Sequence, residues 1–108
     1  MTWKEAERKM KALMEKHGYQ TADEETARIK WDGEEHLLGL KCVQYVNIKD
    51  IGRTQEKVTL GVEAYIRERK NKRLTLREIR QLSEECRRAE GLMKEVEESR
   101  LTFIRHFT

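Results

Sequence analysis

The chain contains no proline, two cysteines, and no apolar run near the ~20 residues needed to span a bilayer. We therefore expect no membrane span. The first residues, Met1 to Glu5, also lack the apolar core of a signal peptide. Cys42 and Cys86 fall in segments of apolar periodicity, so we expect buried, reduced thiols in a cytoplasmic protein. The lack of proline removes one kind of break in the chain.

The sequence also lacks the residue spacings that mark common active sites. Its three histidines lie in different segments, without HxxxH, CxxC or CxxH spacing, which predicts no metal site. The glycines form no phosphate-binding loop, and no serine or cysteine stands beside an evident general base. Nearly all of the 20 acidic residues lie in charged stretches, where solvation is the default. We predict a protein that is not an enzyme and has no cofactor.

Charged residues are abundant. Asp, Glu, Lys and Arg make up 40% of the chain, against roughly a quarter in an average domain. The 37% of apolar residues fall into periodic blocks, which indicates a folded domain with a charged surface. A net charge of +3 does not by itself indicate nucleic-acid binding. The length of 108 residues fits a single domain over 1–108.

Two segments carry helix signals. Thr2 and Glu5 form a capping box that starts a helix over 2–17, and Gly18 provides its stop. Thr75 and Glu78 repeat the capping box and start a helix that reaches about Ser99. Apolar residues at steps of three and four predict the buried stripe of this second helix. The stripe consists of Ile79, Leu82, Cys86, Ala89, Met93 and Val96.

Between the helices, alternating apolar residues predict three strands, over 26–31, 35–48 and 57–66. Residues 20–25 read as a loop, Asp32-Gly33 as a two-residue hairpin turn, and Gly39 as a bulge. Residues 101–107 fit either a strand or a continued helix, and β-branched and aromatic content favours the strand. The predicted fold is α+β: a helix, a three-stranded antiparallel meander, a long helix, and an apolar C-terminal tail that forms a fourth strand if extended.

The second helix exceeds the predicted sheet in length. It should measure about 37 Å at 1.5 Å per residue, against roughly 20–30 Å for the strands. We therefore expect its distal half and the tail to carry uncovered apolar side chains and to form a homodimer interface. The alternative is that the tail folds back onto its own sheet. The predicted interface residues are Leu92, Met93, Val96, Leu101, Phe103, Ile104 and Phe107.

Residues 67–80 carry the strongest local charge, with seven basic residues against two acidic ones. They cover the end of the third strand, a loop and the start of the second helix, where N–H groups and the helix dipole favour anions. We predict binding of a phosphate-bearing ligand, either nucleic acid or a nucleotide, with an aromatic ring for stacking. The predicted binding residues are Tyr65, Arg67, Arg69, Lys70, Lys72, Arg73, Arg77 and Arg80. Trp31 is a second stacking candidate, although a core position is favoured for it.

The same charges are also compatible with a solvated surface and with a different function. Residues 23–35 carry six acidic residues against two basic ones, so the chain is electrically polarised. Such polarity also suits docking on a charged protein. The alternative function is a protein-binding adaptor or inhibitor, such as a small antagonist encoded by a mobile element. It would mask a partner's surface with its polarised faces or its apolar tail.

Overall fold

The structure is a computed structural model that describes residues 1–32, 35–47 and 54–106. Helix α1 (Trp3–Lys16) precedes four strands, and helix α2 (Leu76–Ser99) precedes a fifth. The strands are β1 (Tyr19–Ala22), β2 (Arg28–Trp31), β3 (Leu38–Val46), β4 (Gln55–Ile66) and β5 (Thr102–His106). The α+β class and both helices are confirmed. The predicted capping box is confirmed at Thr75 and Glu78. At the start of α1, Thr2 accepts from the Glu5 N–H as expected, but Glu5 Oε1 accepts from the Thr2 hydroxyl rather than from its N–H.

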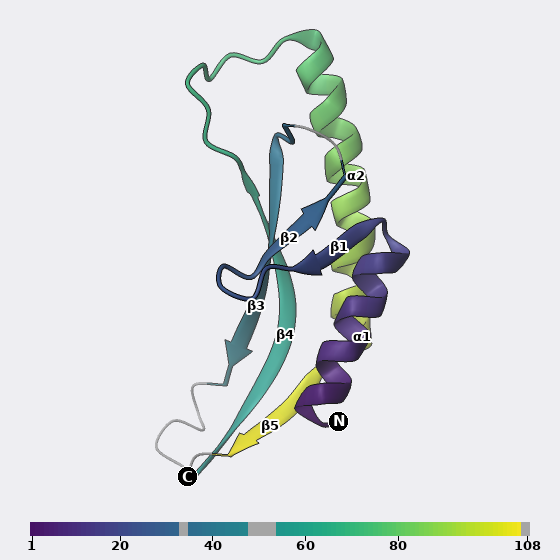
Figure 1. Cartoon of the computed structure of the whole chain (residues 1–108), viewed down its shortest axis with the longest axis vertical. Helices are drawn as coiled ribbons and strands as arrows, with labels where there is room; N and C mark the ends of the chain where they lie inside the picture. Colours follow the sequence, from purple (N-terminus) through teal and green to yellow (C-terminus); the bar gives the residue numbers. More distant parts are fainter. Residues whose placement is uncertain (33–34, 48–53, 107–108) are drawn as a thin grey trace.

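The five strands form one antiparallel sheet in the order β1-β2-β3-β4-β5. Its centre is the β3–β4 ladder, which runs in unbroken register from Leu38↔Ile66 to Val46↔Val58. Both helices lie on the same side of the sheet, and α2 runs along its length (Figure 1). The molecule is elongated, with extents of 51 × 27 × 23 Å.

The sequence missed β1, because residues 20–25 read as a polar loop. This edge strand has four residues and buries only Tyr19 fully, so it shows little alternation. The following turn is held by the Asp23 carboxylate, which accepts hydrogen bonds from the N–H groups of Thr26 and Glu25 at 3.1 and 2.9 Å. The bond from Thr26 is the main reason that the pKa of Asp23 is lowered.

The expected two-residue turn at Asp32-Gly33 is wrong. Such a turn would pair Arg28 with residue 37, whereas Arg28 pairs with Lys41. The connection between β2 and β3 is therefore longer than a tight hairpin. Gly33 itself lies outside the described residues, as do residues 48–53 between β3 and β4.

The bulge expected at Gly39 is also absent, because the β3–β4 register continues through this residue. Gly39 lies directly under the ring of its cross-strand partner Tyr65, and a Cβ atom there would collide with that ring. Gly61 lies under the ring of Tyr45 in the same way. The glycines thus allow close approach of an aromatic ring over the strand and do not mark a bend in it.

The C-terminal tail is a strand, as the sequence favoured, and it pairs with the first part of β4 from Gln55↔His106 to Thr59↔Thr102. Its apolar side chains therefore join the core of the same chain. The buried apolar residues are Ala6, Met10, Met14, Tyr19, Ile29, Leu38, Leu40, Val58, Val62, Ala89, Leu92, Val96, Leu101 and Phe103.

This packing corrects the predicted homodimer interface. The side chains that should have been uncovered are at most 3% exposed for Leu92, Val96, Leu101 and Phe103. Met93 is partly buried against the core, and Phe107 lies outside the described residues. Ile104 alone, at 56% exposure, has the expected accessibility. The tail covers its own sheet, and this removes the argument for a dimer through these residues.

The buried stripe of α2 is rotated by about one residue from the predicted one. It runs through Leu82, Glu85, Ala89, Leu92 and Val96, at alternating steps of three and four. Cys86 is consequently exposed, contrary to expectation, and so is Ile79. Cys42 is partly buried, and burial raises the pKa of its thiol.

We expect the Cys86 thiol to react with a disulfide reagent at pH 8 roughly tenfold faster than the Cys42 thiol, because the thiolate is the reacting form. Stopped-flow reaction with Ellman's reagent measures both rates. The variant Cys86→Ser should lose the fast phase, and Cys42→Ser should lose the slow one. A fast phase that survives in Cys86→Ser would show that α2 is turned differently.

Candidate anion-binding surface

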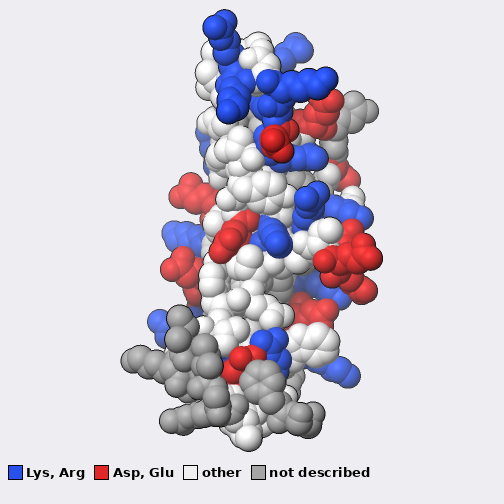
Figure 2. Space-filling model, turned by 90° about the vertical axis from the view of Figure 1, so that its left-hand side faces the viewer, with Lys and Arg blue, Asp and Glu red and all other residues white. Residues whose placement is uncertain are grey.

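The predicted basic residues lie at one end of the elongated molecule. The chain leaves β4 after Ile66 and enters α2 after Thr75, and the first turns of this helix extend beyond the sheet (Figure 1). Lysine and arginine side chains gather at this end, whereas acidic and basic side chains alternate over the rest of the visible face (Figure 2). We call residues 67–80 the basic end. Of the charge sorting expected from the sequence, the basic cluster is visible on this face.

Most of the basic side chains at this end are not neutralised. Arg69 forms an ion pair with Glu78, and the hydrogen bond from Arg69 is the main cause of the lowered pKa of Glu78. The others are exposed and have no acidic partner among the residues that the structure describes. These are Arg67, Lys70, Lys72, Arg73, Arg77 and Arg80.

The N-terminus of α2 is already capped by the chain itself. The Thr75 N–H donates to Glu78 Oε1 at 3.1 Å, and the Glu78 N–H donates to Thr75 Oγ1 at 3.2 Å. We had expected an anion to meet free N–H groups here. Two of these groups are occupied, and the Glu78 carboxylate stands beside them. An anion would therefore contact the basic side chains rather than the helix terminus.

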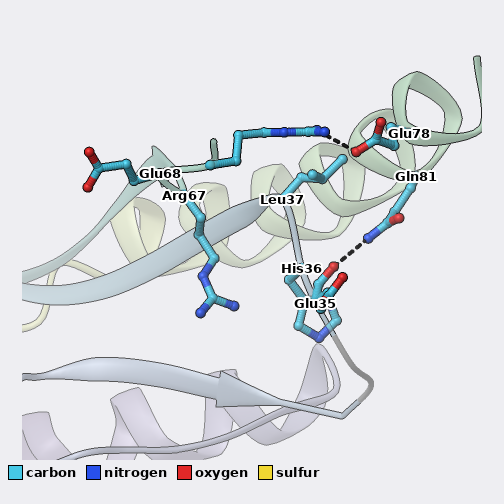
Figure 3. Close-up of a pocket in the computed structure, with 8 residues that line it drawn as sticks. Glu35, His36, Leu37, Arg67, Glu68, Glu78 and Gln81 are labelled. Carbon is cyan, nitrogen blue, oxygen red and sulfur yellow. Dashed lines mark hydrogen bonds and ion pairs between the residues drawn. The ribbon is translucent and has the colours of Figure 1, made fainter. Parts of the chain in front are cut away.

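A cleft of about 530 Å³ opens between the end of β4, residues 35–37 and the second turn of α2 (Figure 3). The Arg67 side chain extends from the strand without a contact to another labelled residue, and Gln81 Nε2 donates to the Glu35 carbonyl at 3.0 Å. The lining residues are Glu35, His36, Leu37, Arg67, Glu68, Arg69, Glu78 and Gln81. Three carboxylates against two guanidinium groups make this cleft a poor pocket for a small anion.

Beneath the cleft lies Glu85, which sequence reasoning missed. This side chain is 5% exposed. Its Oε1 accepts hydrogen bonds from the N–H groups of Leu37 and Leu38 at 2.8 and 3.0 Å. Its Oε2 accepts from Gln81 Nε2 at 3.2 Å, and His36 Nδ1 lies 3.6 Å away. The sequence signal was the place of Glu85 on the stripe that includes Ala89 and Leu92.

The two aromatic candidates differ in availability. Trp31 is stacked on His36, with ring centroids 3.4 Å apart, and meets the edge of Tyr19 at 5.4 Å. Arg88 also lies over its ring. Trp31 is therefore engaged within the protein. Tyr65 is 39% exposed and precedes Arg67 by two residues on the outer side of β4, so its ring is accessible beside the basic end.

Comparison with known proteins identifies no relative: no family model, curated protein or solved structure matches this chain. Within residues 1–32, 35–47 and 54–106, no helix has the length and apolar character needed to cross a membrane. In the same ranges, no three His, Cys, Asp or Glu side chains are grouped so that they could hold a metal ion.

We expect Glu85→Ala to destabilise the protein by about 3 kcal/mol, because it leaves the N–H groups of Leu37 and Leu38 without acceptors. Glu85→Gln keeps one acceptor oxygen and should cost about 1 kcal/mol. Urea denaturation followed by circular dichroism measures both values. The exposed neighbour provides a control, since Glu84→Ala should change stability by no more than about 0.5 kcal/mol. Equal effects of the two alanine variants would contradict the role of Glu85.

Proposed function

We propose that this protein is a non-enzymatic nucleic-acid-binding module that contacts phosphates through its basic end. One observation carries the proposal: six basic side chains with no acidic partner among the described residues gather at one end, whereas the charges over the rest of the face in Figure 2 are mixed. Clustering of this kind opposes folding through self-repulsion. A polyanion would relieve that repulsion and release its own counterions on binding.

The arrangement favours nucleic acid over a free nucleotide. The unpaired cations are distributed along the loop, from Lys70 to Arg73, and over the first two turns of α2 at Arg77 and Arg80. A chain of phosphates reaches such separated positions, whereas one nucleotide does not. The adjoining cleft is lined by three carboxylates, which disfavour a buried phosphate. Tyr65 supplies one stacking surface, so we expect little sequence preference.

Binding of a fluorescent mixed-sequence oligonucleotide, measured by anisotropy, tests this proposal. With about five phosphate contacts, log K should fall with log salt at a slope of about −4. The triple variant Lys70→Glu, Lys72→Glu, Arg73→Glu should abolish binding at low salt with an unchanged circular dichroism spectrum. These side chains are exposed and make no ion pair that the fold requires.

A matched control reverses the same number of charges on exposed residues of α1: Lys4→Glu, Arg8→Glu and Lys9→Glu. This variant carries the same net charge as the first and should keep binding within a few-fold of the wild type. Equal loss in both variants would show that only net charge matters. Absence of binding by the wild type at low salt would remove the proposal.

A protein-binding adaptor is the second candidate, and one observation favours it. Three aliphatic side chains at the basic end are exposed: Leu74 at 40%, Leu76 at 63% and Ile79 at 51%. Exposed apolar groups among charges are typical of protein-docking surfaces.

If this function holds, Leu76→Asp with Ile79→Asp should lose a partner that the wild-type protein captures from a lysate. The control Ile104→Asp, which alters an exposed aliphatic residue on β5, should retain that partner. Nucleic-acid binding should persist in Ile104→Asp and weaken in the double variant, because the two added carboxylates oppose the contacts of Arg77 and Arg80 with phosphates. Capture that is the same for all three proteins would argue against docking at the basic end.

A further inference from the structure

The last part of β4 pairs with a neighbouring strand on only one side. β4 has 12 residues and pairs with β3 from Val58 to Ile66, but it pairs with β5 only from Gln55 to Thr59. The last contact toward β5 is the hydrogen bond that the Leu60 N–H donates to the Leu101 carbonyl at 2.9 Å. Past this point, no strand among the described residues lies along that side of β4.

The unpaired backbone groups can be assigned residue by residue. In an antiparallel sheet the N–H and C=O of one residue point to the same side, and successive residues alternate. The Arg67 N–H donates to the Leu37 carbonyl on the β3 side, whereas the Leu60 N–H points to the β5 side. Val62, Ala64 and Ile66 share the alternation of Leu60. Their N–H and C=O groups therefore face the side without a strand.

An apolar groove of about 370 Å³ accompanies this open edge, between β4 and α2. Leu38 and Ala64 line it from the sheet. The helix lines it with the uncharged residues Cys86, Ala89 and Met93 and with the charged residues Glu90, Lys94 and Glu97. Ile66, which ends the edge, is 62% exposed. A strand added here would place every second side chain toward α2, as in peptide recognition by strand addition.

The edge lacks a proline, a bulge and an inward-pointing charge, and its charged residue, Glu63, lies on the outer face. Proteins guard open edges with proline, bulges or charges that point inward. This chain has no proline, β4 has no irregularity in its register with β3, and the residues on the inner face are Val62, Ala64 and Ile66. The edge is available to any matching strand, and the one always present is the same edge on another copy.

We propose that two copies of this protein pair through the Val62–Ile66 edge of β4, antiparallel about a two-fold axis at Ala64. This register places Val62 against Ile66 of the second copy, and Glu63 against its Tyr65. No like charges oppose one another, as a two-fold interface requires of a single patch. The two five-stranded sheets then join into one continuous sheet. This surface is distinct from the tail face considered in the sequence analysis.

Light scattering coupled to size exclusion tests the association. The wild type should have a mass of about twice 12.9 kDa, and Ala64→Pro should have the mass of one chain. Proline removes an N–H that faces the added strand, whereas pairing with β3 uses Glu63 and Tyr65 instead. The control Ile104→Lys alters the exposed tail residue and should remain dimeric. Amide exchange at Val62 and Ile66 should be slow in the wild type and fast in Ala64→Pro.

A second variant keeps the proposal testable if Ala64→Pro does not fold. With Cys42→Ser and Cys86→Ser as background, Ala64→Cys should form a covalent dimer with a short bismaleimide crosslinker. Directly opposed residues of a hydrogen-bonded antiparallel pair have Cα atoms about 5.5 Å apart, a separation that such a crosslinker spans. A wild type that is monomeric at every concentration, with fast exchange at Val62 and Ile66, would overturn the proposal. A dimer that survives Ala64→Pro and is lost in Ile104→Lys would also overturn it.

Discussion

The buried carboxylate of Glu85 is the constraint on which one end of the molecule depends, the end where α2 and β3 begin. A carboxylate in the interior is costly unless its oxygens are hydrogen-bonded. Here they accept from the N–H groups of Leu37 and Leu38 and from Gln81. These bonds tie the third turn of α2 to the point where β3 begins. Residues 35–37 are therefore hydrogen-bonded to α2. They cannot continue the pairing with β2 that a tight hairpin would require.

The shape of the basic end follows from this attachment. C-terminal to Glu85, α2 buries Ala89, Leu92 and Val96 against the sheet. N-terminal to Glu85, Leu82 packs against the core, whereas Leu76 and Ile79 in the first turn stay exposed. Polar contacts replace packing there, since Thr75 and Glu78 form the capping box and Arg69 pairs with Glu78. A helix end held in this way can carry many cations without disturbing the core.

Local signals in the sequence predicted the elements that depend on local interactions. The caps at Thr2 and Thr75 gave both helix starts, and the alternation from Val58 to Val62 gave β4. The apolar tail was correctly favoured as a strand, but its pairing partner, the first part of β4, lies more than 40 residues away in the chain and leaves no local signal. β1 is too short and polar to show alternation.

The residues of the candidate surface show the same difference between features with a local sequence signal and features without one. The cluster of cations could be found from the sequence, because it is contiguous. Glu85 could not, because a carboxylate on an apolar stripe reads as an interruption, and its partners are backbone N–H groups from a distant loop. The wrong prediction that Cys86 is buried has the same origin. Periodicity allows two adjacent stripes on α2, and only the hydrogen bonds of Glu85 distinguish between them.

The basic end and the open edge of β4 are adjacent in the chain, since Arg67 follows Ile66 directly. Two copies that carry the same excess of positive charge repel one another when those charges meet. Antiparallel pairing about Ala64 avoids this, because it points the two basic ends in opposite directions along the strands. In this register Arg67 lies opposite residue 61 of the second copy, six residues or about 20 Å from the Arg67 of that copy. This separation exceeds the roughly 8 Å over which charges act at physiological salt. Association through β4 is thus compatible with a basic end that stays free for a polyanion.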